Sequence, residues 1–280
     1  MKKSTVTMVG FLAALACGSS HAAEWGYAGQ QHTTPPNQWH KISPTCGSIK
    51  QQSPINIIDS EALDSKISVT THYKTDLARY QNNGHAVVVD IAKLDNRRWI
   101  ELNMEKNGQP QTTAYDLQQL HFHSLSEHSF SATRKHTPYH YDMELHLIHA
   151  NQEGELVVIG VPIQQGKHNE ALAELFDGLA QGYQQGGINM FADVGELLPK
   201  NNNNVFIYDG SLTTPPCSEG VKWVVFAEPI EMSAKQIETY RGLFSENGER
   251  YHTHRPTQKL NSLMTNMLKW RKVYIGTVNN

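Results

Sequence analysis

Two runs of alternating polar and apolar residues, Gln119–His123 and Tyr141–His149, constrain the fold more than any other part of the sequence. On a β-strand successive side chains point to opposite faces, so His121 and His123 project from the same face of the first run. In the second run, His146 points away from the apolar side chains that flank it. If the two runs pair as antiparallel neighbours, His146 faces the first two imidazoles. The pattern predicts a sheet with a three-nitrogen site on one face.

Three imidazoles are a ligand set that suits Zn²⁺, and three protein ligands leave the fourth tetrahedral position open for water. That arrangement is typical of a catalytic zinc site rather than a structural one. Metal-bound histidines also need a partner at their other ring nitrogen, which fixes the tautomer and the ring orientation. Gln119 shares a strand face with His121, and Glu144 shares one with His146. We therefore expect Gln119 and Glu144 to be these partners.

The histidine pattern by itself is weakly specific, because fifteen histidines in 280 residues produce His-x-His pairs by chance. His252-Thr253-His254 is such a pair. The alternative explanation of each imidazole is an ordinary core or surface histidine with a hydrogen-bond partner. A metal site is favoured by the polar residues Gln119 and Glu144, which lie on the same strand faces as the histidines.

A second class of metal protein fits the first run. His121, His123 and Glu127 match the first metal motif of the cupins, jelly-roll proteins in which the carboxylate binds the metal. The second cupin motif has a Pro-x-Gly shortly before the later histidine and an Asn four residues after it. Neither is present around His146. A cupin-type metalloenzyme is therefore the second hypothesis.

The N-terminus has the organisation of a secretory signal peptide. Met1-Lys2-Lys3 is positively charged, Val6–Ala16 is apolar, and Ser20-His21-Ala22 is a small-x-small cleavage site. The apolar run is too short to span a bilayer, and no later stretch reaches the necessary length. We therefore expect residues 1–22 to be a signal peptide, residues 23–280 to be the mature domain, and the location to be periplasmic or secreted.

Charge and cysteine content fit an exported protein without a nucleic-acid or membrane partner. Removal of residues 1–22 takes away two lysines and no acids, so the formal net charge changes from −3 to −5. This balance does not favour binding to nucleic acid or to an anionic membrane surface. The mature chain keeps Cys46 and Cys217, and an even pair in an exported protein predicts one disulfide. Two buried thiols are the alternative.

The remaining sequence favours one mainly β (α+β) domain with a few peripheral helices, because it contains no linker, repeat or charge block. Helical patterns cover Asn169–Gln181 and Ser233–Phe244, and the second begins with a Ser233…Gln236 capping box. Ser129–His140 is a polar, turn-rich insert. Strand patterns cover Ala86–Ile91, Trp99–Asn103, Gln119–His123, Tyr141–His149, Glu155–Pro162, Val205–Tyr208 and Lys222–Ile230.

Taken together, these motifs resemble the α-class carbonic anhydrases of the bacterial exported type. The resemblance extends over nearly the whole mature chain. The resemblance implies a fold with a large, mostly antiparallel twisted sheet and with zinc at the bottom of a conical cavity. The matching motifs are Trp25-Gly26-Tyr27, Gln52–Ile57, Asn82–His85, Gln119–His123, Ser126-Glu127-His128, Glu144–His149, Ser211–Cys217 and Thr253–Pro256.

The resemblance assigns a role to each site residue. The zinc ligands would be His121, His123 and His146. Gln119 and Glu144 would be hydrogen-bond partners of these ligands. Thr213 would accept a hydrogen bond from zinc-bound solvent and donate its own proton to Glu127. His85 would be the proton shuttle, and Tyr27 and Asn83 would order the water chain. Cys46 and Cys217 match the disulfide of secreted members. The CO₂ site would comprise Ile148, Val158, Leu212, Thr214, Val221 and Trp223.

The activity that the resemblance implies is the zinc-dependent, reversible hydration of CO₂ to bicarbonate and a proton by attack of zinc-bound hydroxide. A homodimer is possible, as in many exported bacterial relatives. A third hypothesis, a non-catalytic carbonic-anhydrase-like binding module, requires a missing ligand, and all three histidines are present. The sequence departs from many relatives at Val88, Ser124, Ala150 and Thr253, where packing and water order are expected to differ.

Overall fold

The computed structural model describes residues 25–74, 76–91, 99–183, 185–192, 194–200, 204–259 and 272–279. The expected signal peptide, residues 1–22, and the expected start of the domain at residue 23 lie outside these ranges. Among the described residues, no helix combines the length and the apolar character that a membrane span requires.

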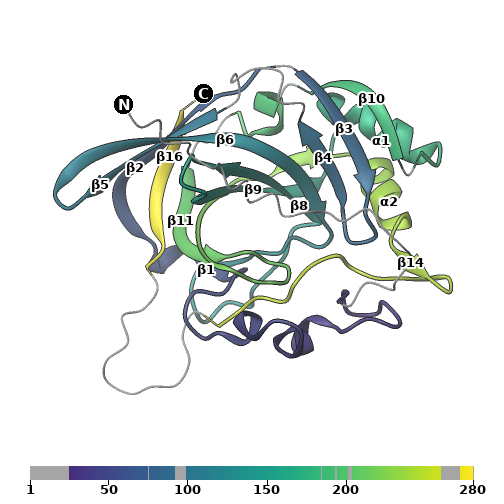
Figure 1. The fold of residues 1–280 in the computed structure, drawn as a ribbon, viewed down its shortest axis with the longest axis horizontal. Helices are drawn as coiled ribbons and strands as arrows, with labels where there is room; N and C mark the ends of the chain where they lie inside the picture. The colour runs from purple at the N-terminus through teal and green to yellow at the C-terminus, as the bar shows by residue number, and fades with distance from the viewer. Residues whose placement is uncertain are drawn as a thin grey trace, which may run out of the picture.

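A twelve-stranded sheet organises the described chain (Figure 1). The strand order is β10-β3-β4-β6-β5-β2-β16-β11-β12-β9-β13, and β8 pairs with both β6 and β9. The strands of this sheet are β2 (Leu63–His72), β3 (Asp76–Asn82), β4 (Val87–Ile91), β5 (Trp99–Lys106), β6 (Gln109–His123), β8 (Met143–Ala150), β9 (Leu156–Gln165), β10 (Gln185–Ala192), β11 (Asn204–Ser211), β12 (Glu219–Phe226), β13 (Ile230–Met232) and β16 (Tyr274–Asn279). The short pairs are β1 (Asn56–Ile58) with β7 (Ser129–Ser131) and β14 (Ser245–Glu246) with β15 (Glu249–Arg250).

Most neighbouring strands run antiparallel, and the long strands curve across the molecule (Figure 1). The parallel pairs of the large sheet are β2 with β16, β9 with β12, and β9 with β13. The predicted fold class, a mainly β protein built on a large, mostly antiparallel sheet with few helices, is confirmed.

Both predicted helices are present with shorter bounds. α1 covers Ala173–Ala180 after a 3₁₀ turn, and α2 covers Ala234–Gly242. Ser233 caps α2 with the expected reciprocal pair, because its hydroxyl accepts from the Gln236 amide and the Gln236 side chain accepts from the Ser233 amide. The two α-helices pack against each other at one side of the sheet (Figure 1). The 3₁₀ helices are η1 (Pro36–Lys41), η2 (Pro44–Gly47), η3 (Asp59–Glu61), η4 (Glu170–Leu172) and η5 (Val194–Leu197).

The seven predicted strands all exist, but their ends differ. β6 begins at Gln109 instead of Gln119, and the segment Lys222–Ile230 contributes to two strands, β12 and β13. Within the large sheet, the strands β2, β3, β10 and β16 were not predicted, and neither were the short strands β1, β7, β14 and β15. The insert Ser129–His140 begins with the buried strand β7, which pairs in parallel with β1.

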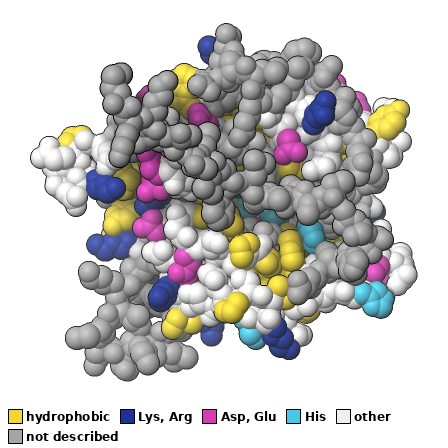
Figure 2. Space-filling view, viewed as in Figure 1, with side chains coloured by type: hydrophobic (Ala, Val, Ile, Leu, Met, Phe, Trp, Pro, Cys, Tyr) yellow, Lys and Arg dark blue, Asp and Glu magenta, His cyan; other side chains and the backbone are white. Residues whose placement is uncertain are grey.

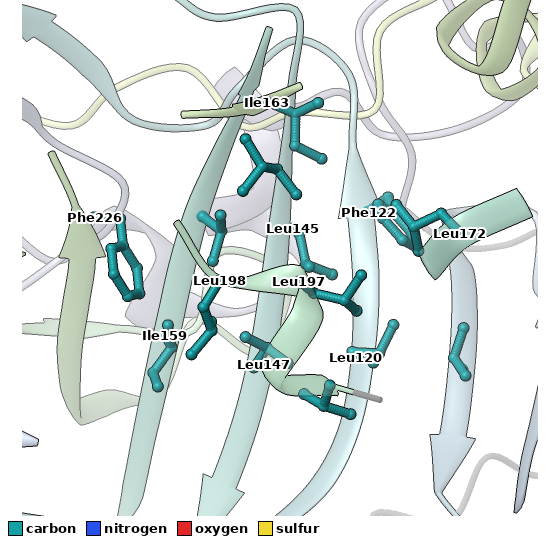
Figure 3. Close-up of a cluster of buried hydrophobic side chains, with 14 of the residues drawn as sticks. Leu120, Phe122, Leu145, Leu147, Ile159, Ile163, Leu172, Leu197, Leu198 and Phe226 are labelled. Atoms are coloured by element: carbon teal, nitrogen blue, oxygen red, sulfur yellow. The ribbon is translucent and has the colours of Figure 1, made fainter. Parts of the chain in front are cut away.

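The main hydrophobic core lies on the face of β6 and β8 that is opposite the histidines. Leu120 and Phe122 from β6 meet Leu145 and Leu147 from β8 in one buried cluster, and η5 adds further leucines (Figure 3). At about 25 cal/mol per Å² of apolar surface removed from water, this burial holds both strands in register. A one-residue slip would move every one of these leucines to the opposite face, so the core fixes the direction of the imidazoles.

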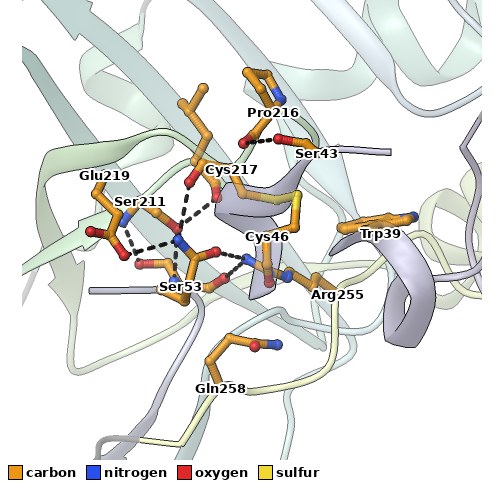
Figure 4. The surroundings of a disulfide bond; sticks show 12 residues. Trp39, Ser43, Cys46, Ser53, Ser211, Pro216, Cys217, Glu219, Arg255 and Gln258 are labelled. Carbon is orange, nitrogen blue, oxygen red and sulfur yellow. Dashed lines mark hydrogen bonds between the residues drawn. A yellow bond between two sulfur atoms is a disulfide. The ribbon is translucent and has the colours of Figure 1, made fainter. Parts of the chain in front are cut away.

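Cys46 and Cys217 form the predicted disulfide, with Cα atoms 5.0 Å apart. The buried Arg255 guanidinium donates to the carbonyl of Cys46 at 2.9 Å and to the carbonyl of Ser53 at 2.7 Å (Figure 4). The Cys217 carbonyl accepts from Gln52 Nε2 at 3.1 Å. The disulfide therefore belongs to a hydrogen-bonded layer that joins the N-terminal segment to two distant parts of the chain.

Candidate metal centre

β6 and β8 are antiparallel neighbours, as supposed from the sequence, and their register places His121 opposite His146 and His123 opposite Glu144. The ring centres of the three histidines are 4.6, 4.9 and 5.1 Å apart. One nitrogen of each ring lies within 4.8 Å of the corresponding nitrogens of the other two. The three imidazoles therefore converge on one point, as the alternation predicted.

The three rings are neutral, which is the form that a metal ligand requires. Burial lowers the pKa of His123 to about 4 and lowers the pKa of His121 and of His146. His123 Nε2 is buried without a hydrogen-bond partner among the described residues. A buried nitrogen lone pair without a partner is costly, and a divalent cation would satisfy it. The residues present therefore fit a metal ion.

Two hydrogen bonds fix the tautomers of His123 and His146. His123 Nδ1 lies 2.6 Å from the backbone carbonyl of Thr253, which can only accept, so Nδ1 carries the proton. His146 Nε2 lies 2.8 Å from Glu144 Oε1 and donates to the carboxylate. Nε2 of His123 and Nδ1 of His146 thus keep their lone pairs. The expected role of Glu144 as a partner of His146 agrees with this contact.

The arrangement around His121 differs from the expectation. Gln119 lies on the same strand face, but its Oε1 is buried and has no hydrogen-bond partner among the described residues. The register shift between Leu117 and Gln119 in the pairing of β6 with β8 lies at this position. Strand periodicity places a side chain on a face, but it does not fix the rotamer that a hydrogen bond needs.

Glu144 connects the histidine set to a buried hydrogen-bond chain that sequence reasoning missed. Its carboxylate accepts from His128 Nδ1 at 2.6 Å and from the His128 amide at 2.9 Å. His128 Nε2 lies 2.7 Å from the Tyr208 hydroxyl, which donates to Ser53 Oγ at 3.0 Å. Although burial raises the pKa of Glu144, the facing His128 and His146 rings hold it well below its usual value. The carboxylate is therefore ionised and strengthens His146 as a ligand.

Glu144→Gln should weaken zinc binding by about 10- to 100-fold, because the neutral amide cannot accept from His146 and His128 as a carboxylate does. The measurement is the zinc dissociation constant by competition with a chelator of known affinity. Glu153→Gln, the same change at an exposed turn, is the matched control. Equal zinc affinity in the wild type and Glu144→Gln would show that this carboxylate does not support the ligands.

Glu127 is fully buried beside the histidines, and its Oε1 accepts from the Arg255 amide at 2.9 Å. Burial raises the pKa of Glu127 to about 7, and His146, the Thr213 hydroxyl and the Arg255 amide act to lower it. A divalent cation next to the carboxyl would lower its pKa further. The structure thus brings together Glu127 and Thr213, the pair that the family resemblance implies.

An apolar surface adjoins the imidazoles. Ile148, Val158, Leu212, Val221 and Trp223 all belong to one hydrophobic cluster, separate from the main core. The Trp223 ring lies 4.8 Å from the His146 ring, and its Nε1 donates to the carbonyl of Ser211. On the face drawn in Figure 2, histidine and hydrophobic side chains lie next to one another near the middle of the view.

Three further predicted residues, Thr214, Asn83 and His85, lie in the connections between strands. The Thr214 carbonyl accepts a hydrogen bond from the Cys217 amide at 2.8 Å. His85 stacks on Trp25 with ring centres 3.8 Å apart, and burial lowers its pKa to about 4. Asn83 Oδ1 accepts from the His85 amide at 2.9 Å and so shapes the turn that carries His85.

Tyr27 is buried, with its ring 6.5 Å from the His85 ring. The contact between Trp25 and His85 was not predicted. The motif Trp25-Gly26-Tyr27 was noted in the sequence, but no local signal links it to a residue sixty positions away.

A large twisted sheet thus carries three neutral, convergent imidazoles that could hold a metal ion, next to an apolar wall. The sequence model of the eukaryotic-type carbonic anhydrases matches residues 34–265. The chain is 33% identical to a carbonic anhydrase of Nostoc sp., over 85% of this chain and 83% of that protein. It is 30% identical to a carbonic anhydrase of Neisseria gonorrhoeae, over 89% and 92%. The chain belongs to the eukaryotic-type (α) carbonic anhydrase family and is a carbonic anhydrase.

Solved structures agree with this assignment. The α-carbonic anhydrase of Thermovibrio ammonificans, in complex with the inhibitor sulfanilamide, superposes with a TM-score of 0.69 at 33% identity, over 92% of this chain and all of that one. Dioscorin in complex with ascorbate gives a TM-score of 0.71 at 26% identity, over 91% and 98%. The family resemblance is confirmed, and the cupin hypothesis is wrong, because the fold and the matched family are those of the carbonic anhydrases.

Proposed function

We propose that this chain catalyses the reversible hydration of CO₂ to bicarbonate at a zinc ion held by His121, His123 and His146. The observation that carries the proposal is the set of three buried, neutral imidazoles with ligand nitrogens within 4.8 Å of one another. Zinc, when bound, supplies a Lewis acid that lowers the pKa of a water molecule from 15.7 to about 7, the value established for carbonic anhydrase. Hydration of CO₂ is the reaction of the family to which the chain belongs.

Thr213 and Glu127 would orient the group that occupies the open side of the metal. An ionised carboxylate only accepts hydrogen bonds, so the Thr213 hydroxyl must donate to Glu127. Its only proton is then used, so the Thr213 oxygen can only accept a hydrogen bond from a group bound at the metal. A metal-bound group that has no proton to donate is therefore disfavoured. The Arg255 amide, which donates to Glu127 Oε1, holds the carboxylate in place for this role.

The apolar wall would hold the substrate. CO₂ has no hydrogen-bond donor and no net charge. It can therefore bind to a surface of aliphatic and aromatic side chains. Val158, Val221 and Trp223 provide such a surface next to His146. These side chains also exclude water from the place where the carbon must meet its nucleophile.

His85 would carry the released proton to buffer. In its stacked position on Trp25 the ring has a pKa of about 4, so it stays neutral there at pH 7. Outside the stack, an imidazole in water has a pKa near 6.5 and can accept a proton. We therefore propose that the ring moves off Trp25 when it accepts a proton.

His85→Ala should lower turnover in weak buffer on the order of 100-fold, the low end of the range for general acid–base catalysis. Added imidazole should restore part of the rate, because it replaces the missing proton acceptor. Stopped-flow CO₂ hydration measures both effects, with His168→Ala, an exposed histidine, as the control. An unchanged rate in weak buffer would exclude His85 as the shuttle.

We also propose that the enzyme is exported, with residues 1–22 as its signal peptide. The disulfide supports this location, because such bonds persist in oxidising compartments. The possible homodimer stays a prediction.

Metal content and CO₂ hydration of the purified chain together test the proposed function. We expect one zinc per chain at the histidine set, loss of hydration after chelation, and recovery on addition of zinc. Hydration at the full rate by metal-free protein would overturn the proposal.

A further inference from the structure

His123 is contacted through hydrogen bonds at its ring and at both of its neighbours in the chain. The ring nitrogen Nδ1 donates to the backbone carbonyl of Thr253 at 2.6 Å. The amide of Ser124, the next residue, donates to the Thr253 hydroxyl at 3.1 Å. The carbonyl of Phe122, the preceding residue, accepts from the Tyr240 hydroxyl. Two residues, Thr253 and Tyr240, therefore contact the backbone and the ring of one histidine at three points.

The hydroxyls of Tyr240 and Thr253 also bond to each other, with their oxygens 3.2 Å apart. The direction of this bond follows from the proton count. A carbonyl can only accept, so the Tyr240 hydroxyl donates its single proton to Phe122. The Thr253 hydroxyl must then donate to the Tyr240 oxygen, and its own oxygen accepts from the Ser124 amide. One directed chain of hydrogen bonds thus runs from the amide on one side of His123 to the carbonyl on the other.

Every member of this chain is sealed from water. Phe122, Ser124, Tyr240 and Thr253 each have 0% exposed surface. Burial raises the pKa of Tyr240, so its hydroxyl keeps the proton that it donates. The Tyr240 ring packs against the rings of Phe122 and Phe244, whose centres are 6.2 and 4.9 Å away. In such a site bulk water cannot replace a lost partner, so each hydrogen bond matters more than it would at the surface.

We propose that Tyr240 and Thr253 are positioning residues for the metal ligand His123. Their hydroxyls fix the backbone from which the imidazole projects, and the Thr253 carbonyl fixes its tautomer, which keeps the Nε2 lone pair for the metal. A ligand that is oriented before the metal binds loses less freedom on binding. Tyr240 lies on α2 and Thr253 follows β15, so two distant segments support the end of β6. The inference rests on the proposed function, because it takes His123 as a zinc ligand.

Tyr240→Phe tests the proposal, because it removes the hydroxyl and keeps the ring that packs against Phe244. We expect its zinc dissociation constant, measured by competition with a chelator of known affinity, to rise about tenfold, the low end of the range for groups that support a metal ligand. Thr253→Val should weaken zinc binding at least as much, because it also takes the acceptor from the buried Ser124 amide. Thr253→Ser keeps a hydroxyl and should recover most of the affinity that Thr253→Val loses.

Tyr80→Phe is the matched control. The Tyr80 hydroxyl is also buried, but it has no hydrogen-bond partner among the described residues, so its removal should leave zinc affinity unchanged. Thermal unfolding of the metal-free proteins separates positioning from a purely structural role. A purely structural role would lower the Tm and leave the zinc affinity of the folded protein as it is in the wild type.

The proposal is overturned if folded Tyr240→Phe or folded Thr253→Val binds zinc as tightly as the wild type, or if Tyr80→Phe weakens zinc binding as much as they do. Tyr240→Phe decides alone if Thr253→Val does not fold. A wild-type chain that binds no zinc would instead contradict the proposed function, so the two failures are distinguishable.

Discussion

His146→Ala should lose zinc and CO₂ hydration activity together. His146 is the ligand that Glu144 holds in its tautomer, and it sits opposite His121 in the register of β6 and β8. Removal of its imidazole leaves two ligands, too few to keep the ion against a chelator. It also leaves the Glu144 carboxylate without one of its donors in a buried site. We expect a loss of activity on the order of 10⁴-fold or more, because most of the rate acceleration depends on the metal.

Atomic absorption after dialysis measures the metal, and stopped-flow hydration measures the rate. Circular dichroism shows whether the variant is folded, and His136→Ala, an exposed histidine in the insert, is the control. A folded His146→Ala protein that retains one zinc per chain and its activity would contradict the ligand assignment.

The second large effect concerns stability. Cys46→Ala combined with Cys217→Ala should destabilise the protein by up to about 5 kcal/mol, because the bond joins residues 171 positions apart. For a domain of this size, that loss corresponds to a fall in Tm on the order of 10–20 °C. The carbonyls of both cysteines accept hydrogen bonds, from Arg255 and from Gln52, so the disulfide also keeps these donors in place.

Thermal unfolding of the mature chain measures this effect with and without reductant. The reduced wild type should unfold near the temperature of the double variant, and reductant should have no effect on the variant, because the only other cysteine is Cys17. If oxidised wild type and double variant unfold at the same temperature, the disulfide does not stabilise the fold.

The parts of the fold that the sequence predicted are those with a strong local signal. Alternation across Gln119–His123 and Tyr141–His149 placed the imidazoles on one face because side-chain direction in a strand has a period of two. The capping box located the start of α2, with Ser233 as its N-cap. β2 gave no such signal, since Leu63–His72 is mostly half-exposed and polar. β16 lies beside β2 through a pairing of residues about two hundred positions apart, which no local pattern encodes.

In the candidate site, too, the features with a local sequence signal were predicted and those that depend on distant contacts were not. The three histidines were evident from their spacing, whereas the chain from Glu144 through His128 and Tyr208 to Ser53 joins segments from four parts of the sequence. The partner of His123 is a backbone carbonyl, which any residue type can supply. For Gln119 the strand face was predicted, but its Oε1 has no hydrogen-bond partner among the described residues.

Anomalous scattering from a crystal of the zinc-replete protein, at the zinc absorption edge, tests the central claim most directly. We predict a peak about 2.0–2.1 Å from one nitrogen each of His121, His123 and His146, with no other side chain in contact with the ion. A peak that Glu127 also touches, or the lack of any peak between these three rings, would contradict the account.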